Sequence, residues 1–213
     1  MKGFLPLGDG AIYFFALKVS EHCKVFLQTM PQTIKKLSMS ELNRKSVDEF
    51  KQSEKIPVIV VLENIRSMHN VGSVFRTADA FLIEAIYICG YTARPPRKEI
   101  DKTALGATET VGWKYFSTTR EALEELKTNG FKLFAIEQVD KSISLENVNE
   151  IDAEKIALVF GNEVSGVEEE TIKMCDGCIE IPQFGMKHSL NISVAAGIVL
   201  WEVIRCLLPL QEQ

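Results

Sequence analysis

The chain has 213 residues, of which 46% are hydrophobic and 25% are charged. This composition is typical of a soluble globular protein, and the length fits one domain with an appendage better than two full domains. The net charge of −5 argues against a protein that coats nucleic acid through a global positive field, but it leaves room for local basic patches.

The first quarter of the chain differs from the rest. Residues 1–38 mix aromatic side chains, glycine and Pro31 without clear periodicity, so we expect a loosely attached segment. Residues 40–53 predict a short charged helix, with Leu42, Val47 and Phe50 as its apolar positions. We therefore predict an N-terminal extension, 1–54, that is partly helical, followed by one domain, 55–213.

From Pro57 onward, strands and helices alternate. Continuous apolar runs predict strands that are buried on both faces, at residues 58–62, 85–89, 131–136, 156–160 and 178–181. Helices are predicted at residues 71–81, 119–129, 167–174 and 191–208, the second of them ending at Gly130. The loop 90–97 contains Pro95 and Pro96, which exclude regular structure there. The alternation predicts an α/β fold with a parallel sheet covered on both faces.

No apolar run reaches the length of a transmembrane helix, so we expect no membrane contact. Five cysteines are an odd count, which favours free thiols in a reducing compartment, and we expect a cytoplasmic protein. Cys175 and Cys178 form a C-x-x-C pattern without a second ligand pair. We interpret it as a turn between a helix and a buried strand, and we predict no metal site.

In parallel sheets ligands bind beyond the carboxyl ends of the strands, which directs attention to three loops. The first, residues 63–70, ends at Asn70, which we interpret as a helix N-cap. Gly72 permits close backbone approach. Arg76 follows six positions after Asn70, so the two do not share a helical face. They form either a cap and a surface arginine or a functional polar pair.

In the second loop, residues 161–166, two glycines bracket Glu163 after a buried strand. This pattern fits a capped helix start, with Glu163 near the positive helix end, or a cofactor loop with exposed backbone groups. It matches neither a Walker loop nor a G-x-G-x-x-G fingerprint.

The third loop, residues 182–190, runs into an apolar helix through Ser189, Leu190 and Asn191. Serine and asparagine are preferred where the first N–H groups of a helix lack partners. We therefore predict a binding loop joined to a core helix. That helix is apolar almost all round, so it must be buried on more than one side, by its own subunit or by a second copy.

Taken together, the loops resemble the three ordered motifs of the SpoU (TrmH-like) branch of the SPOUT RNA methyltransferases. The matching patterns are Asn70-x-Gly72-x-x-x-Arg76, Phe160-Gly-Asn-Glu-Val-Ser-Gly166 and Ile181-Pro-x-x-Gly-x-x-x-Ser-Leu-Asn191. The segment from Pro95 to Ala107 and Trp113 also resembles that family, and the likeness covers about residues 55–207. It implies a C-terminal deep trefoil knot, S-adenosylmethionine as cofactor, a homodimer, and methyl transfer to a ribose 2′-OH of structured RNA.

The resemblance also implies residue roles. Its catalytic set corresponds to Asn70, Arg76, Glu163, Ser189 and Asn191. Its cofactor-binding positions correspond to Gly161, Asn162, Glu163, Ile181, Gln183, Ser189 and Leu190. A separate basic loop supplies the RNA-binding candidates Arg94, Arg97 and Lys98. Because arginine is effectively always protonated, Arg76 acts either as the family's general base or as an electrostatic clamp.

Two other classes of protein are alternatives to an RNA methyltransferase. A non-catalytic RNA-binding relative would keep the fold and lose motif residues, whereas all five catalytic candidates are present. A small-molecule α/β enzyme has little support without a nucleotide fingerprint or a Gly-x-Ser-x-Gly motif. Only about 55 residues precede the first core strand, and we therefore expect tRNA as the substrate in preference to rRNA.

Overall fold

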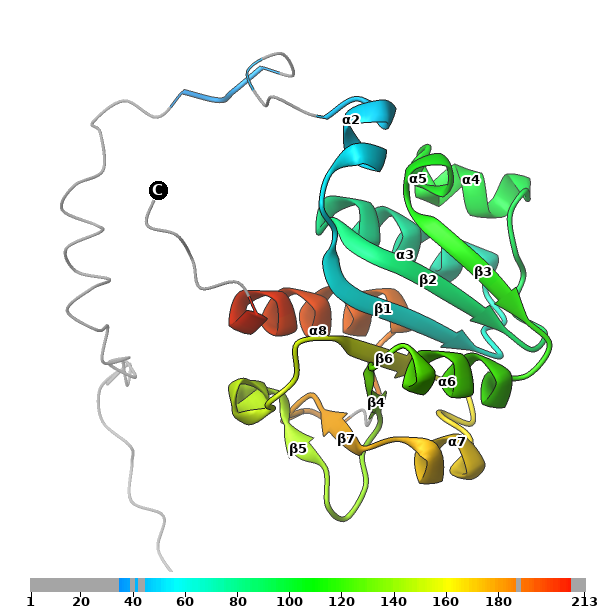
Figure 1. Cartoon of the computed structure of the whole chain (residues 1–213), viewed down its shortest axis with the longest axis vertical. Coiled ribbons are helices and arrows are strands. Elements are labelled where there is room, and N and C mark those ends of the chain that lie inside the picture. The colour runs from blue at the N-terminus through cyan, green and yellow to red at the C-terminus, as the bar shows by residue number, and fades with distance from the viewer. Residues whose placement is uncertain (1–34, 39–40, 42–44, 187–188, 208–213) are drawn as a thin grey trace, which may run out of the picture. The chain divides into compact units, whose positions relative to one another are not determined.

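The computed structural model describes residues 35–38, 41, 45–186 and 189–207 (Figure 1). Contacts divide the chain into two units, Met1–Arg44 and Lys45–Gln213. All elements discussed below belong to the second unit. The boundary at residues 54 and 55 stays a prediction, and most of the segment 1–38 lies outside the described residues.

Seven parallel strands form one sheet in the order β3-β2-β1-β6-β4-β7-β5. They are β1 Ile56–Glu63, β2 Ile83–Cys89, β3 Gly112–Phe116, β4 Lys132–Ile136, β5 Ile143–Ser144, β6 Ile156–Phe160 and β7 Gly177–Glu180. The predicted parallel α/β sheet is therefore confirmed, including all five of the predicted strands.

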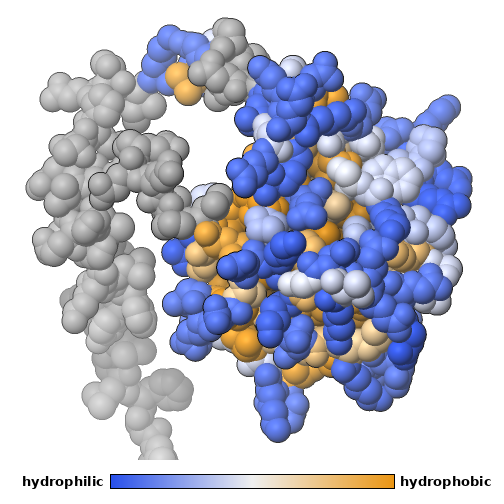
Figure 2. Space-filling view, viewed as in Figure 1, coloured by the Kyte–Doolittle hydropathy of each residue, from blue (hydrophilic) through white to orange (hydrophobic). Residues whose placement is uncertain are grey.

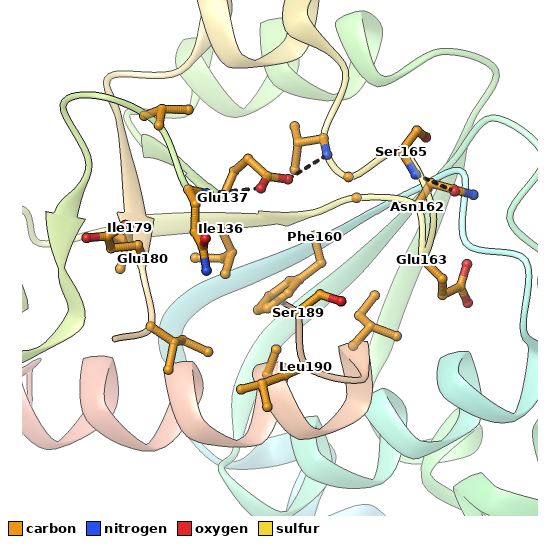
Figure 3. Close-up of a pocket in the computed structure, with 18 of the residues that line it drawn as sticks. Ile136, Glu137, Phe160, Asn162, Glu163, Ser165, Ile179, Glu180, Ser189 and Leu190 are labelled. Carbon is orange, nitrogen blue, oxygen red and sulfur yellow. Dashed lines mark hydrogen bonds between the residues drawn. The ribbon is translucent and has the colours of Figure 1, made fainter. Parts of the chain in front are cut away.

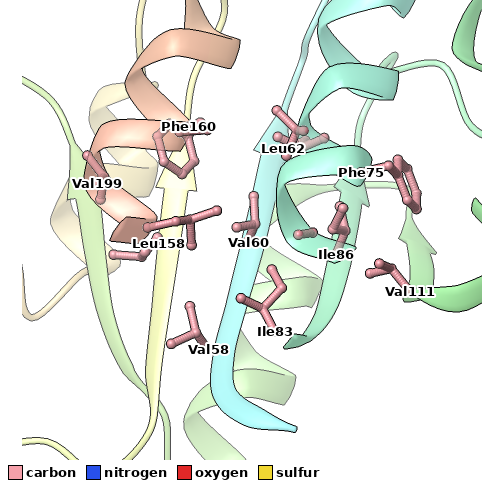
Figure 4. Close-up of a cluster of buried hydrophobic side chains, with 14 of the residues drawn as sticks. Val58, Val60, Leu62, Phe75, Ile83, Ile86, Val111, Leu158, Phe160 and Val199 are labelled. Carbon is pink, nitrogen blue, oxygen red and sulfur yellow. The ribbon is translucent and has the colours of Figure 1, made fainter. Parts of the chain in front are cut away.

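Helices cover both faces of this sheet (Figure 1). They are α3 Met68–Ala80, α4 Lys98–Ala104, α5 Ala107–Thr110, α6 Thr119–Thr128, α7 Glu169–Met174 and α8 Ile192–Leu207, with a 3₁₀ turn, η2, at Leu145–Glu150. On β1, Val58, Val60 and Leu62 face the core beneath α3 and α8 (Figure 4), whereas Ile59 and Val61 face the core beneath α6. This alternation explains the continuous apolar strand sequences.

Two predicted helix starts were wrong. Asn70 is not an N-cap: α3 begins at Met68, because the Ser67 hydroxyl accepts a hydrogen bond from the Asn70 N–H at 3.3 Å. The helix predicted at 40–53 is α2 Val47–Gln52, which begins late because Ser46 and Glu49 form a reciprocal capping box. Of the earlier part of that prediction, residues 40 and 42–44 lie outside the described residues.

The prediction omitted α4, α5, β3, β5 and η2. The helices are short, and β3 is an edge strand with four exposed residues out of five, so it lacks the apolar run of a buried strand. The irregular loop 90–97 is confirmed. Its first residue, Gly90, has φ +63°, and a Cβ there would lie 2.0 Å from the Asn64 side-chain oxygen.

The C-x-x-C segment is a turn, as predicted, because α7 ends at Met174 and β7 begins at Gly177. Burial raises the pKa of the Cys175 thiol to about 12, so it stays protonated at neutral pH. Within the described part of the chain, no three His, Cys, Asp or Glu side chains are grouped as metal ligands. None of the helices described is long and apolar enough to cross a membrane.

Candidate active site

The loop after β6 closes on itself, and its glycines make this closure possible. The Asn162 N–H donates to the Gly166 carbonyl and the Gly166 N–H donates to the Asn162 carbonyl, each at 2.9 Å. A Cβ on Gly161 would lie 2.2 Å from backbone atoms of Gly166 and Val167. Gly166 itself has φ +71°. Residues 161 and 166 must therefore be glycine for this loop to form.

The Asn162 side chain ties this loop to two others. Its oxygen accepts the N–H groups of Val164 at 2.8 Å and Ser165 at 3.1 Å. Its nitrogen donates to the Asn64 carbonyl and to the Tyr91 hydroxyl, each at 2.8 Å. Asn162 is only 9% exposed, and these four bonds satisfy its buried amide.

Glu163 binds the backbone just before helix α3, in a distant part of the chain. Its carboxylate accepts the backbone N–H groups of Arg66 and Ser67, each at 3.0 Å, and the Asn70 side-chain amide, also at 3.0 Å. Partial burial raises the pKa of Glu163, but these hydrogen bonds outweigh it and bring the pKa below its usual value. A carboxylate at the first turn of α3 also interacts favourably with the helix dipole.

Asn191 joins the third loop to the same network. Its amide nitrogen donates to the Asn70 side-chain oxygen at 3.2 Å. Its oxygen accepts the Ser193 N–H at 2.9 Å, so the predicted cap of the closing helix is confirmed at Asn191. The network Glu163–Asn70–Asn191 therefore brings together one residue from each of the three predicted motifs.

A cavity of about 630 Å³ lies beside this network (Figure 3). Its lining includes every residue that was predicted to bind the cofactor: Gly161, Asn162, Glu163, Ile181, Gln183, Ser189 and Leu190. The volume is typical of sites for small molecules and cofactors. Asn70 is not part of the lining, and it reaches the cavity through its contacts with Glu163 and Asn191.

Two acidic residues of the cavity, Glu137 and Glu180, were missed from the sequence. The Glu137 carboxylate accepts the Val167 N–H at 3.2 Å, and a Cβ on Gly166 would lie 2.2 Å from it. Their positions in the sequence could have identified them. Glu180 ends β7 and Glu137 directly follows β4, at the edge of the sheet where ligands bind.

The remaining candidates lie outside the cavity lining. Arg76 is exposed on α3. Glu163 does not hold it, since the carboxylate contacts Arg66, Ser67 and Asn70. The RNA-binding candidates Arg94, Arg97 and Lys98 are exposed around the start of α4. The guanidinium carbon of Arg94 lies 4.1 Å from the centre of the Tyr115 ring.

Residues 57–201 match the SpoU rRNA Methylase family, which is more than half of the chain. The chain belongs to the SpoU family. Among SpoU relatives, a tRNA (guanosine(18)-2′-O)-methyltransferase of Thermus thermophilus is 32% identical over 167 residues, which cover 78% of this chain and 84% of that protein. A 23S rRNA (guanosine-2′-O-)-methyltransferase RlmB of Neisseria meningitidis is 34% identical, covering 70% of this chain and 58% of that protein.

Solved SpoU structures have the same fold. The A. aeolicus TrmH/SpoU tRNA modifying enzyme superposes with a TM-score of 0.65 at 30% identity, covering 75% of this chain and 80% of that chain. An AdoMet-bound rRNA methyltransferase from Sinorhizobium meliloti gives the same TM-score at 28% identity, covering 78% of this chain and 62% of that chain. The predicted membership of the SpoU family is therefore confirmed.

Proposed function

We propose that this SpoU protein transfers a methyl group from S-adenosylmethionine to a ribose 2′-OH of RNA. One observation supports this above all: the cavity at the carboxyl edge of the sheet borders the network of Glu163, Asn70 and Asn191. The network belongs to the three motifs of the family, and the named relatives methylate 2′-oxygens of tRNA or rRNA.

The residues around the cavity fit S-adenosylmethionine, which supplies an electrophilic methyl group on a sulfonium cation. Phe160, Ile181 and Leu190 offer apolar surface for a nucleobase. The carboxylates of Glu137 and Glu180 complement a positive charge. The two glycines of the closed loop keep its backbone compact beside the cavity.

A ribose hydroxyl is a weak nucleophile and must lose its proton as it attacks. Because a guanidinium cation is a poor general base, we infer that Arg76 attracts RNA phosphate and stabilises the negative charge developing on the 2′-oxygen. Asn70 is a positioning residue, because Glu163 and Asn191 hold both ends of its amide.

The decisive experiment maps 2′-O-methyl sites in total cellular RNA with and without this protein. At least one site should disappear in its absence, and no lost site would contradict the proposal. With the RNA identified, Arg76→Ala should lower kcat about 100- to 1,000-fold, the usual cost of losing one electrostatic donor. Arg120→Ala is the matched control, because Arg120 is exposed on α6 beneath the opposite face of the sheet.

We propose tRNA as the preferred substrate. The matched stretch accounts for 84% of the Thermus tRNA enzyme and 58% of the Neisseria rRNA enzyme, so the similarity extends over more of the tRNA enzyme. Unmodified tRNA transcripts should be methylated faster than 23S rRNA fragments, and the reverse order would contradict this preference. Binding through Arg94, Arg97 and Lys98 should weaken steeply as salt increases from 50 to 200 mM, by about tenfold or more.

We also propose a C2 homodimer built on α8. On this helix, Val194, Ile198 and Trp201 follow one another at helical spacing and are 39–54% exposed. In Figure 2, hydrophobic surface gathers where α8 lies. A second copy would cover this apolar face. Light scattering at micromolar concentration should give twice the mass of the chain, and a monomeric mass would contradict the dimer.

We also propose a trefoil knot in this fold. The segment leading into α8 would be threaded as a deep trefoil knot, as the family resemblance implies. The approach of Asn191 to Asn70, 121 residues apart in the sequence, is compatible with such a path. We further propose that the protein acts in the cytoplasm, where tRNA and rRNA are modified.

A further inference from the structure

The edge strand β3 presents two aromatic rings to solvent. Trp113 and Tyr115 are each 37% exposed. They pair in register with Ile86 and Ile88, which are buried in the core beneath α3. Because residues paired in register point to the same face of a sheet, both rings lie on the α3 side, where β3 runs beside α4 and α5 (Figure 1).

A cation already stacks on one of these rings. The Arg94 guanidinium carbon lies 4.1 Å from the Tyr115 ring centre, within the range of cation–π contacts. The Tyr115 hydroxyl donates to the Gly90 carbonyl at 3.1 Å, at the start of the loop that carries Arg94. In the same loop, buried Thr92 donates to the Leu62 carbonyl and accepts the Ile65 N–H. The arrangement is therefore held in place before any ligand arrives.

The same loop connects this surface to the candidate active site. The Tyr91 side chain is 63% exposed, yet its hydroxyl accepts the Asn162 amide of the closed loop at 2.8 Å. Tyr115 is next to the last residue of β3, so it lies at the carboxyl edge of the sheet. Two strand spacings of about 4.8 Å separate β3 from β1, which leads into α3.

Local charge favours a polyanion at this place. Residues 94–102 carry four cationic side chains and two carboxylates, although the whole chain has a net charge of −5. Exposed aromatic rings beside arginine are how proteins hold unpaired bases of RNA, with the cations contacting phosphate. A purely structural role in holding the loop would explain the hydroxyls of Tyr91 and Tyr115 and the position of Arg94, but it would not explain the exposed ring of Trp113.

We propose that Tyr91, Arg94, Trp113 and Tyr115 form a stacking platform for an unpaired base of the RNA substrate, close to the nucleotide that is methylated. The platform rests on the proposed function for its substrate. With such a platform, the protein binds RNA at single-stranded loops or bulges in preference to continuous duplex. Base-on-aromatic stacking accounts for about 5- to 150-fold of affinity per base.

The first test separates stacking from clamping by kinetics. Trp113→Leu and Tyr115→Leu should each raise the KM for RNA about tenfold, with unchanged affinity for S-adenosylmethionine and little change in kcat. Trp113→Phe and Tyr115→Phe keep a ring and should stay within about twofold of wild type. If Tyr115→Phe is as damaging as Tyr115→Leu, the hydroxyl clamp on Gly90 is the role of Tyr115 and the platform is wrong.

The second test detects the stacked base directly. The chain has two tryptophans, at positions 113 and 201, so Trp201→Phe leaves Trp113 as the single fluorophore. Its emission should be quenched by an unmodified tRNA transcript and much less by a blunt RNA duplex of equal charge. Binding of the transcript, followed by anisotropy of a label on the RNA, without any quenching of Trp113 would overturn the platform.

The two readouts also separate this inference from the function on which it rests. A wild-type protein whose Trp113 is quenched by RNA, but which methylates none, overturns the proposed function and keeps the platform. A wild-type protein that methylates RNA, with an unchanged KM in both leucine variants, overturns the platform alone.

Discussion

Adding one methyl group at Gly161 tests whether the closed loop shapes the cofactor cavity. In Gly161→Ala, the new Cβ would lie 2.2 Å from the Gly166 carbonyl carbon and oxygen and from the Val167 nitrogen. Ordinary contacts begin at about 3.4 Å, so this backbone must move by about 1.2 Å. All three atoms that the new Cβ would meet belong to the backbone, so no flexible side chain can move aside to make room.

The energetic cost follows from the bonds that this movement breaks. The two 2.9 Å hydrogen bonds between Asn162 and Gly166 would lengthen to about 4 Å, beyond hydrogen-bonding distance. Each contributes about 0.5–1.5 kcal/mol, so the closed conformation loses about 1–3 kcal/mol. A ligand that needs the closed loop should then bind about 5- to 150-fold more weakly.

Isothermal titration with S-adenosylmethionine measures this loss directly. The midpoint temperature of thermal unfolding should also fall, by about 2–4 °C for each kcal/mol of stability lost in a chain of this size. Gly112→Ala is the matched control, because its Cβ would meet the nearest atom, the Glu84 carbonyl oxygen, at an ordinary 3.5 Å. If Gly161→Ala binds within twofold of wild type while the control behaves as expected, the closed loop does not form the cofactor site.

Three further substitutions test the network and the two cores. Glu163→Gln should cost about 1 kcal/mol of stability at pH 7, the usual value of a helix cap at an exposed site. Because the folded pKa of Glu163 lies below its usual value, the carboxylate stabilises the wild type fully above pH 4.5. This contribution is lost as the pH falls through the lowered pKa, so the stabilities of the two proteins should converge as the pH decreases below 4.5. Gly72→Ala places a Cβ 2.2 Å from the Ile100 carbonyl oxygen and should destabilise by about 1–3 kcal/mol in urea unfolding, whereas equal midpoints would contradict the tight contact of α3 with α4. Leu126→Ala, in the fully buried core beneath α6, should cost about 2–5 kcal/mol without altering cofactor affinity, and a weaker affinity would show that this core supports the cavity.

Much of the sheet could be predicted because its signal is local. A strand buried on both faces is apolar throughout, as in the run from Val58 to Leu62, and the alternation with helices then predicts parallel order. The edge strand β3 could not be recognised, since its outer residues are exposed. The start of α3 was missed because both Ser67 and Asn70 are good capping residues, and the hydrogen bond that the Ser67 hydroxyl accepts from the Asn70 N–H decides between them.

The site was predictable only as three loops at one edge of the sheet. Which side chains meet there depends on the adjacency of β1 and β6, which no local pattern contains. One of the two interpretations put Glu163 near a helix start in its own segment, but the groups that its carboxylate binds lie 93–97 residues earlier. Glu137 and Glu180 belong to the cavity for the same non-local reason.

Glu163 lies in the loop that borders the cavity and binds the backbone just before α3, so the cavity lining and the start of α3 are in direct contact. A ligand that orders residues 161–166 also orders the backbone of Arg66 and Ser67, and with it the amide of Asn70. If RNA engages the start of α3 and a ligand fills the cavity, reciprocity requires that each change the affinity for the other by the same factor. The carboxylate at position 163 is the side chain that would carry such coupling.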